Sequence, residues 1–219
     1  MKQSIFTILE NTALTRDVYR MVLEGDTSAV TASAQFVNIQ LDGLYLRRPI
    51  SVFDCEDGIL SIIYKVVGKG TEQMTTLPVG TSLDVLTGLG NGYNLEKIGE
   101  KPLLVGGGVG VPPLYYLAKK LIACGKKPEI IVGFNTSSEI FGVEFFEELG
   151  LKVTVTTVDG SVGVKGFVTN ALEEIDYDYV CTCGPEPMLK ALYRATEAKG
   201  QYSFEERMGC GFGACMGCS

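Results

Sequence analysis

The pattern of apolar residues changes once along the chain, near residue 100, and this change constrains the fold most. Before it, short alternating runs are separated by turn residues such as Asp57-Gly58, a pattern typical of antiparallel strands. The runs expected to form strands are Ser4–Glu10, Asp17–Leu23, Gln35–Gln40, Ile50–Asp54, Ile59–Val66 and Ser82–Leu86. Because no helical stretch of comparable strength interrupts them, they predict a small six-stranded antiparallel β-barrel.

From Pro102 onward, strand-like runs alternate with helical runs. The expected strands are Leu103–Val105, Glu129–Phe134, Val153–Val158 and Tyr179–Thr182. The expected helices are Pro113–Ala123, Val143–Leu149, Val168–Glu174 and Pro187–Ala198. Such alternation implies right-handed crossovers and a parallel sheet covered on both faces. The predicted fold class is therefore β + α/β, with a barrel domain at 1–98, a parallel-sheet nucleotide-binding domain at 99–202 and a small C-terminal segment at 203–219.

Composition excludes several classes of protein. With 46% hydrophobic and 21% charged residues, the 219-residue chain is expected to be globular. A net charge of −7 argues against a nucleic-acid groove and against binding to an anionic membrane surface. The apolar stretch Leu103–Leu117 is interrupted by glycine and proline, so we expect no membrane span and no signal peptide. These features favour a cytoplasmic protein.

The chain contains no histidine. This removes Ser–His and Cys–His dyads, the usual catalytic zinc ligands and the commonest general base, so a bound group is expected to carry the chemistry. Seven cysteines, gathered toward the C-terminus, fit a reducing compartment better than a disulfide scaffold. Four of them are expected to pack in the core: Cys55, Cys124, Cys181 and Cys183.

The C-terminal tail places Cys210, Cys215 and Cys218 at C-x4-C-x2-C spacing in a glycine-rich loop. This is the opening of a plant-type [2Fe–2S] site, and glycines let the backbone curl around a cluster. A one-electron carrier is therefore the first hypothesis. The alternatives are a tail with adventitious thiols, part of a zinc knot, and a thioredoxin-like dithiol, for which Cys215 and Cys218 follow the last predicted helix instead of opening one.

A second glycine-rich segment contains Gly106, Gly108, Gly110 and Pro113, between a predicted strand and a predicted helix. Phosphates can approach such a backbone, and a helix N-terminus offers free N–H groups and a positive dipole end. Pro113 stands where a third glycine would complete the dinucleotide-binding pattern. The segment is interpreted as a pyrophosphate site, with tight packing as the alternative.

Two further motifs lie where ligands bind in such folds. Cys183, Gly184, Pro185 and Met188 follow a predicted strand of the parallel sheet, and open α/β sheets bind ligands at the carboxyl ends of their strands. An ordinary strand-to-helix turn is the alternative. In the barrel, Arg48 begins the strand-like segment Arg48–Ser51, and a guanidinium can bind a phosphate through two hydrogen bonds. By itself this segment also fits surface strand residues.

The ordered combination of R-P-x-S, G-x-G-x-x-P and C-G-P-x-x-M resembles the ferredoxin–NADP reductase superfamily over essentially the whole chain. The tail pattern E-R-M-x-C-G-x-G-x-C-x-x-C is similar to that of electron-transfer subunits of type B dihydroorotate dehydrogenases. The resemblance implies that Cys210, Cys215 and Cys218 are cluster ligands, with a fourth cysteine beyond Ser219. It implies FAD contacts at Arg48, Pro49, Ile50, Ser51, Ile63, Tyr64, Lys65, Gly70 and Thr71, the last two in a loop.

The resemblance also implies a function. NADH would rest on the Gly106–Pro113 turn, the Cys183–Met188 loop would direct its nicotinamide toward FAD, and Ser51 would lie near the reactive edge of the flavin. Electrons would pass through a [2Fe–2S] cluster to or from the FMN of a dihydroorotate dehydrogenase catalytic subunit, in a heterotetramer with two of each subunit, in de novo pyrimidine (UMP) biosynthesis. This subunit itself would not bind dihydroorotate.

The sequence also predicts which nucleotide is bound. NAD(H) is favoured over NADP(H), because Gly133–Gly142 contains no arginine or lysine to meet a 2′-phosphate. The nearest alternative is the flavin subunit of another ferredoxin:NAD(P) oxidoreductase or of a sulfhydrogenase. From a different class, the chain could be a non-enzymatic docking module whose tail binds zinc.

Overall fold

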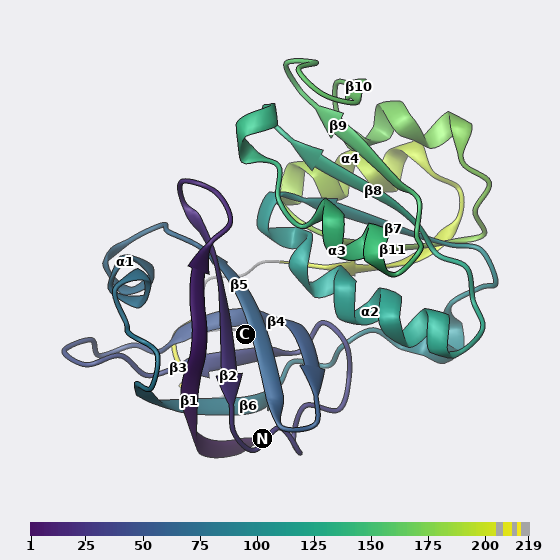
Figure 1. Ribbon diagram of the computed structural model, residues 1–219. Helices are drawn as coiled ribbons and strands as arrows, with labels where there is room; N and C mark the ends of the chain where they lie inside the picture. Colours follow the sequence, from purple (N-terminus) through teal and green to yellow (C-terminus); the bar gives the residue numbers. More distant parts are fainter. Residues whose placement is uncertain (205–207, 212–213, 216–219) are drawn as a thin grey trace. The chain divides into compact units, whose positions relative to one another are not determined.

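The structure, a computed structural model, describes residues 1–204, 208–211 and 214–215 (Figure 1). The chain forms two compact units. The first contains Met1–Gly92 together with the described residues of the C-terminal tail. The second begins at Tyr93 and contains every later helix and strand. The change of pattern near residue 100 therefore marks a real change of architecture.

The first unit is a closed barrel of six antiparallel strands, as predicted. Its elements are β1 (Lys2–Ala13), β2 (Val18–Glu24), β3 (Phe36–Ile39), β4 (Arg48–Glu56), β5 (Ile59–Lys65), α1 (Lys69–Thr75) and β6 (Ser82–Leu89). Around the barrel, the strand order is β1-β2-β5-β4-β3-β6. The alternation seen in the sequence places Phe6, Ile8, Met21, Val37 and Ile62 in a fully buried core.

Helix α1 was not among the elements predicted for the barrel domain. Gly70 and Thr71, expected in a loop, lie in its first turn. The helix has only seven residues, with a glycine and two threonines of low helix propensity, so the sequence carried little signal for it. Packing holds it instead: Asn11 Nδ2 on β1 donates to the carbonyls of Met74 at 2.8 Å and Leu77 at 3.2 Å.

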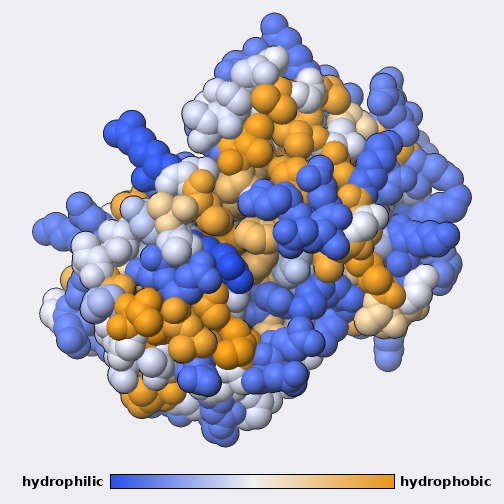
Figure 2. Space-filling model, in the orientation of Figure 1, coloured by the Kyte–Doolittle hydropathy of each residue, from blue (hydrophilic) through white to orange (hydrophobic). Residues whose placement is uncertain are grey.

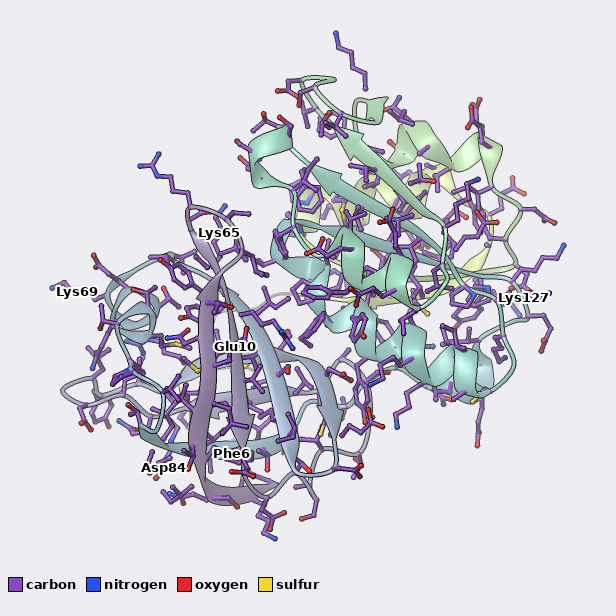
Figure 3. All side chains as sticks on the ribbon, in the orientation of Figure 1. Phe6, Glu10, Lys65, Lys69, Asp84 and Lys127 are labelled. Carbon is purple, nitrogen blue, oxygen red and sulfur yellow. The ribbon has the colours of Figure 1, made fainter. Side chains whose placement is uncertain are left out.

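An arginine ties β3 to β6. Arg47 Nη1 donates to Asp84 Oδ1 at 2.9 Å and to the backbone carbonyls of Asn38 and Asp84, each at 3.2 Å. The hydrogen bond from Arg47 is the main reason that the pKa of the Asp84 carboxyl, labelled in Figure 3, is held below its ordinary value. The β3–β6 register shifts between Phe36 and Asn38, so this contact braces an irregular part of the barrel.

The second unit is a six-stranded sheet whose neighbouring strands are all parallel, as predicted. Its strands are β7 (Pro102–Gly107), β8 (Glu129–Phe134), β9 (Val153–Thr157), β10 (Val164–Lys165), β11 (Tyr179–Cys183) and β12 (Lys199–Ser203). Its helices are η1 (Leu95–Lys97), η2 (Gly108–Gly110), α2 (Pro112–Ala123), η3 (Ser137–Glu139), α3 (Val143–Glu148), η4 (Val168–Glu174) and α4 (Glu186–Ala195), where η marks a 3-10 helix. Helices α2 and α3 pack together, as do α4 and η4, and Figure 1 shows the two pairs on opposite faces of the sheet.

Three details of the predicted α/β pattern were wrong. The helix expected at Pro187–Ala198 ends at Ala195, and β12 follows it. The segment Val168–Glu174 is a 3-10 helix, not an α-helix. Strands β10 and β12 were not predicted, because both are edge strands and Lys199-Gly200-Gln201 is too polar to read as a buried strand.

None of the helices in the described residues is long and apolar enough to cross a membrane. Figure 2 shows apolar residues exposed on this face of the barrel. Exposed apolar side chains of the barrel include Ile5 and Leu9 on β1.

Candidate functional site

Strands β4 and β5 pair over only part of their lengths. Their register runs from Glu56↔Ile59 to Val52↔Ile62, with a bulge-like shift between Val52 and Asp54. Beyond this point β4 continues to pair with β3, and β5 with β2. The two strands thus part between Arg48–Ser51 and Ile63–Lys65, all of which the structure describes, and backbone groups on the parted edges are available to a ligand. The predicted flavin residues therefore lie on the two sides of one split in the barrel.

Arg48 and Gly70 meet at the start of this split. A Cβ on Gly70 would lie 1.9 Å from Arg48 Nε and 2.8 Å from Arg48 Cδ, so only glycine lets the arginine lie across the first turn of α1. Arg48 Nη1 donates to the carbonyl of Leu46 at 2.6 Å, which holds the guanidinium in place. The side chain is half-buried. This arrangement presents a fixed cation beside parted strands and suits a phosphate group.

Thr71 was expected to contact FAD, but its hydroxyl forms hydrogen bonds within its own segment of the chain. Its hydroxyl accepts the N–H of Val67 at 2.9 Å and of Gly68 at 3.3 Å, and donates to the carbonyl of Gly68 at 3.1 Å. The side chain is buried and its hydrogen-bonding capacity is used within the segment leading into α1. Thr71 therefore shapes the loop that leads from β5 to the helix.

The side chains of Ile63, Tyr64 and Lys65 are also engaged within the barrel unit. Tyr64 Oη donates to Asn11 Oδ1 at 3.0 Å, and its ring stacks on Tyr19 with centroids 5.8 Å apart. Burial raises the pKa of Tyr64, so the phenol stays protonated. Lys65, labelled in Figure 3, forms an ion pair with Asp17 at 3.2 Å. A ligand in the split would meet the backbone of these residues, since the side chains of Ile63 and Tyr64 are buried and that of Lys65 is paired with Asp17.

In the second unit, the direction of chain winding reverses at β7. Strands β8, β9 and β10 follow on one side of β7, and β11 and β12 lie on the other. The carboxyl ends of β7 and β11 are adjacent, with Gly106 opposite Cys183. This is a topological switch point, the place where open α/β sheets bind nucleotides.

The two predicted nucleotide motifs touch at this point. A Cβ on Gly110 would lie 2.2 Å from the Cys183 carbonyl oxygen and 2.6 Å from Gly184 Cα. A Cβ on Gly107 would lie 2.6 Å from Met188 Sδ. The Gly106–Pro113 turn and the Cys183–Met188 loop thus pack closely against each other and form one cradle, although about 75 residues separate them in the chain.

The start of α2 offers fewer free donors than expected. Pro112 and Pro113 lack an N–H, and Leu114 N–H donates to the Val111 carbonyl at 3.1 Å. The expectation of free N–H groups in this first turn was wrong, because proline and a local turn remove them. The glycine turn itself is the remaining approach for phosphates: a Cβ on Gly108, at φ +52°, would meet no atom within 4 Å.

Tyr93 supports the end of β11 but belongs to none of the sequence motifs. Tyr93 Oη donates to the carbonyl of Thr182 at 2.8 Å, directly before Cys183 on β11. Burial raises the pKa of Tyr93 well above its ordinary value, so it remains a donor. Tyr93 therefore fixes the end of the strand that carries the second motif. A lone tyrosine in a glycine-rich stretch gives no sequence signal for this role.

The described part of the tail packs on the barrel. Asn38 Nδ2 on β3 donates to the carbonyl of Cys210 at 2.8 Å. A Cβ on Gly209 would lie 3.1 Å from Cys215 Sγ, so this thiol lies close to the backbone beside Cys210. Among the described residues, no three His, Cys, Asp or Glu side chains form a metal-binding group. Cys218, the third predicted ligand, lies outside the described residues.

The other cysteines divide into two kinds. Cys181 and Cys183 are buried, as expected, and burial raises the pKa of Cys181 to about 12. A thiol in this state is a poor metal ligand. Cys124 is exposed and Cys55 is half-buried, so the expectation that both pack in the core was wrong. Cys124 follows directly after the last turn of α2, where the helix meets solvent.

Comparison with known proteins gives relatives over the full chain. No family model matches the chain. It is 44% identical to the dihydroorotate dehydrogenase B (NAD(+)) electron transfer subunit of Shouchella clausii, over 99% of this chain and 88% of that protein. It is 42% identical to the protein of the same name from Fusobacterium nucleatum, over 100% of this chain and 89% of that protein.

Solved structures agree with the fold. The chain matches an NADH-dependent reduced ferredoxin-NADP oxidoreductase with a TM-score of 0.86 and 30% identity, covering 97% of this chain and 80% of that one. A ferredoxin NADP+ reductase from Neisseria gonorrhoeae, solved with bound FAD and NADP, matches with a TM-score of 0.75 at 13% identity, covering 93% and 100% of the two chains, and shows the shared fold alone. With this fold and with full-length identities of 42–44%, the chain belongs to the family of electron transfer subunits of dihydroorotate dehydrogenase B (NAD(+)).

Proposed function

We propose that this chain carries electrons between NAD(H) and the FMN of a dihydroorotate dehydrogenase catalytic subunit, through FAD in the barrel and a [2Fe–2S] cluster held by the tail. The catalytic subunit would bind dihydroorotate, in a heterotetramer with two of each subunit that serves UMP biosynthesis. One observation carries the proposal. The cysteine tail is held on β3, the strand that pairs with the Arg48–Ser51 segment of β4.

The residues of the barrel fit FAD. Arg48 would hold the pyrophosphate, the backbone of Ile63–Lys65 would face the flavin side of the split, and Gly70 leaves room for the arginine. Pro49, Ile50 and Ser51 line the opposite edge, and the Ser51 hydroxyl is suited to hydrogen-bond a ring heteroatom. These assignments stay predictions, and they are supported by the parting of β4 and β5 between Arg48–Ser51 and Ile63–Lys65.

The tail fits an iron–sulfur cluster through the chemistry of its donors. Thiolates are the ligands that iron–sulfur clusters prefer, and Cys215 Sγ lies beside Gly209, the residue before Cys210. With Cys218, Cys210 and Cys215 would supply three of the four ligands. Zinc would accept the same thiolates, so only the bound metal separates the two assignments.

NADH would rest in the cradle at the switch point, on the turn that contains Gly106, Gly108 and Gly110, and the Cys183–Met188 loop would direct its nicotinamide toward FAD. Bound FAD supplies the conversion between a hydride and single electrons, so the chain needs no general base. Its own residues bind, orient and exclude water. This agrees with a sequence that has no histidine.

The residues expected near the adenosine end of the bound nucleotide favour NAD(H) over NADP(H). Glu139 accepts hydrogen bonds from Asn135 after β8, and Asp159 accepts two from Ser161 after β9, which lowers the pKa of Asp159. Both side chains lie near the carboxyl edge of the sheet, after β8 and after β9. A 2′-phosphate would meet negative charge there, and Gly133–Gly142 supplies no cation to offset it.

The function is tested on the complex purified without oxygen from cells that express the native gene. We expect flavin and iron–sulfur absorption bands, bleaching of both by NADH, and co-purification with a protein that reduces this FAD when given dihydroorotate. A colourless, zinc-containing sample would refute the electron-transfer proposal. A coloured complex whose FAD is not reduced by dihydroorotate would indicate another ferredoxin:NAD(P) oxidoreductase or a sulfhydrogenase.

Replacing Arg48 by alanine is expected to weaken retention of FAD. The change removes a fixed cation that would make charge-assisted hydrogen bonds worth about 1.5–3 kcal/mol, so the dissociation constant should rise roughly 10- to 150-fold. Flavin content per chain after gel filtration measures the effect. Arg16→Ala, at an exposed arginine of the same unit, is the matched control. Equal flavin content in both variants would show that the phosphate site is misplaced.

A further inference from the structure

Asn38 is a polar residue in an unusual position. Its neighbours on β3, Val37 and Ile39, are fully buried in the barrel core. Because side chains alternate along a strand, Asn38 points to the outer face of the barrel. It is nevertheless only 1% exposed. A Cβ on Gly211 would lie 3.0 Å from Asn38 Nδ2, so the cysteine tail is what covers it.

The amide of Asn38 makes one hydrogen bond of clear consequence. Nδ2 donates to the carbonyl of Cys210 at 2.8 Å. Oδ1 is buried without a hydrogen-bond partner among the residues that the structure describes. Burying an amide under a loop costs free energy unless the amide does something there that an apolar residue cannot. What Asn38 does is fix the backbone of the first predicted cluster ligand.

The backbone of Asn38 is fixed as firmly as its side chain. Its carbonyl accepts a hydrogen bond from Arg47 at 3.2 Å, and it pairs with Pro49 on β4. Neighbouring strands lie about 4.8 Å apart. Asn38 therefore connects Cys210 with the strand segment Arg48–Ser51 through one hydrogen bond and one strand-to-strand step.

We infer that Asn38 is a positioning residue that holds Cys210, and with it the iron–sulfur cluster, beside the flavin-binding segment of β4. The inference rests on the proposed function, since it takes Cys210 as a cluster ligand. It assigns the role to the amide N–H of Asn38. A residue that merely filled space under the tail would not need this group.

The test compares Asn38→Leu, which removes both polar atoms, with Asn38→Asp, which keeps the shape but replaces the donor by an oxygen. Both are made in the complex with its natural C-terminus and isolated without oxygen. Losing the hydrogen bond should speed release of iron to a chelator roughly two- to tenfold, and more in Asn38→Asp, whose carboxylate faces the Cys210 carbonyl. The EPR spectrum of the reduced cluster should change in both variants, while the FAD content stays at the wild-type level.

Each other outcome has a distinct meaning. Unchanged iron release and an unchanged EPR spectrum in both variants would overturn the inference. Parallel loss of FAD and cluster, with a lower unfolding midpoint, would also overturn it, because Asn38 would then only support the barrel. If the wild-type complex binds FAD and NADH but holds no cluster, the proposed function fails first, and the inference falls with it.

Discussion

Replacing Cys215 by serine is expected to abolish the proposed iron–sulfur cluster while FAD remains bound and reducible by NADH. Cys215 Sγ lies beside the backbone next to Cys210, on the tail, whereas the residues proposed to hold FAD lie on β4, β5 and α1. A serine hydroxyl is a far weaker iron ligand than a thiolate. Iron content should fall from about two atoms per chain to near zero.

The measurement has three parts. Iron and sulfide analysis and EPR of the reduced protein report the cluster, absorbance at the flavin bands reports FAD, and NADH oxidation with an artificial dye reports transfer to the flavin. Electron transfer to the catalytic subunit should be lost together with the cluster.

Cys124→Ser is the matched control, because Cys124 is an exposed cysteine of the second unit. It should leave every signal unchanged. Loss of FAD together with the cluster in Cys215→Ser would mean that the tail is part of the flavin site. Retention of the cluster would mean that Cys215 is not a ligand.

The architecture could be predicted from the sequence because it follows from local patterns of apolar residues and turn residues. Strand β8 was predicted with its observed bounds, Glu129–Phe134, since a buried parallel strand is a continuous apolar run flanked by polar residues. Elements that depend on their surroundings were missed. Helix α1 is stabilised by Asn11 from β1, and edge strand β12 by its pairing with β11, and neither partner is near in sequence.

The candidate site shows the same division. The residues that carry recognisable motifs, such as Arg48 and Gly110, were all named from the sequence. Their spatial relations were not. The contact between Gly110 and Cys183 depends on β7 lying beside β11, which strand order alone decides. Asn38 and Tyr93 had no motif at all, and the only hint for Asn38 was an amide within the apolar run Phe36–Ile39.

The glycine at position 110 offers the sharpest test of the nucleotide site. An alanine Cβ there would lie 2.2 Å from the carbonyl oxygen of Cys183 and 2.6 Å from Gly184 Cα, both backbone atoms that cannot rotate away. Relief requires the two turns to separate by about 1 Å, a displacement that can cost about 100-fold in rate when it misplaces a bound reactant. Gly110→Ala should therefore lower kcat/KM for NADH about 100-fold, measured with an artificial electron acceptor.

Two further measurements isolate the cause of that loss. FAD and iron per chain should stay at wild-type levels, because their proposed ligands belong to the first unit. Gly125→Ala is the matched control: Gly125 has φ +77° with no atom within 4 Å of an added Cβ, so alanine there adds backbone strain of about 1 kcal/mol in the same unit without touching the switch point. If Gly125→Ala impaired NADH oxidation as strongly as Gly110→Ala, general destabilisation would explain both. If Gly110→Ala oxidised NADH at the wild-type rate, NADH would have to bind away from the junction of β7 and β11. A nucleotide bound at that junction would be displaced when the Gly106–Pro113 turn and the Cys183–Met188 loop separate.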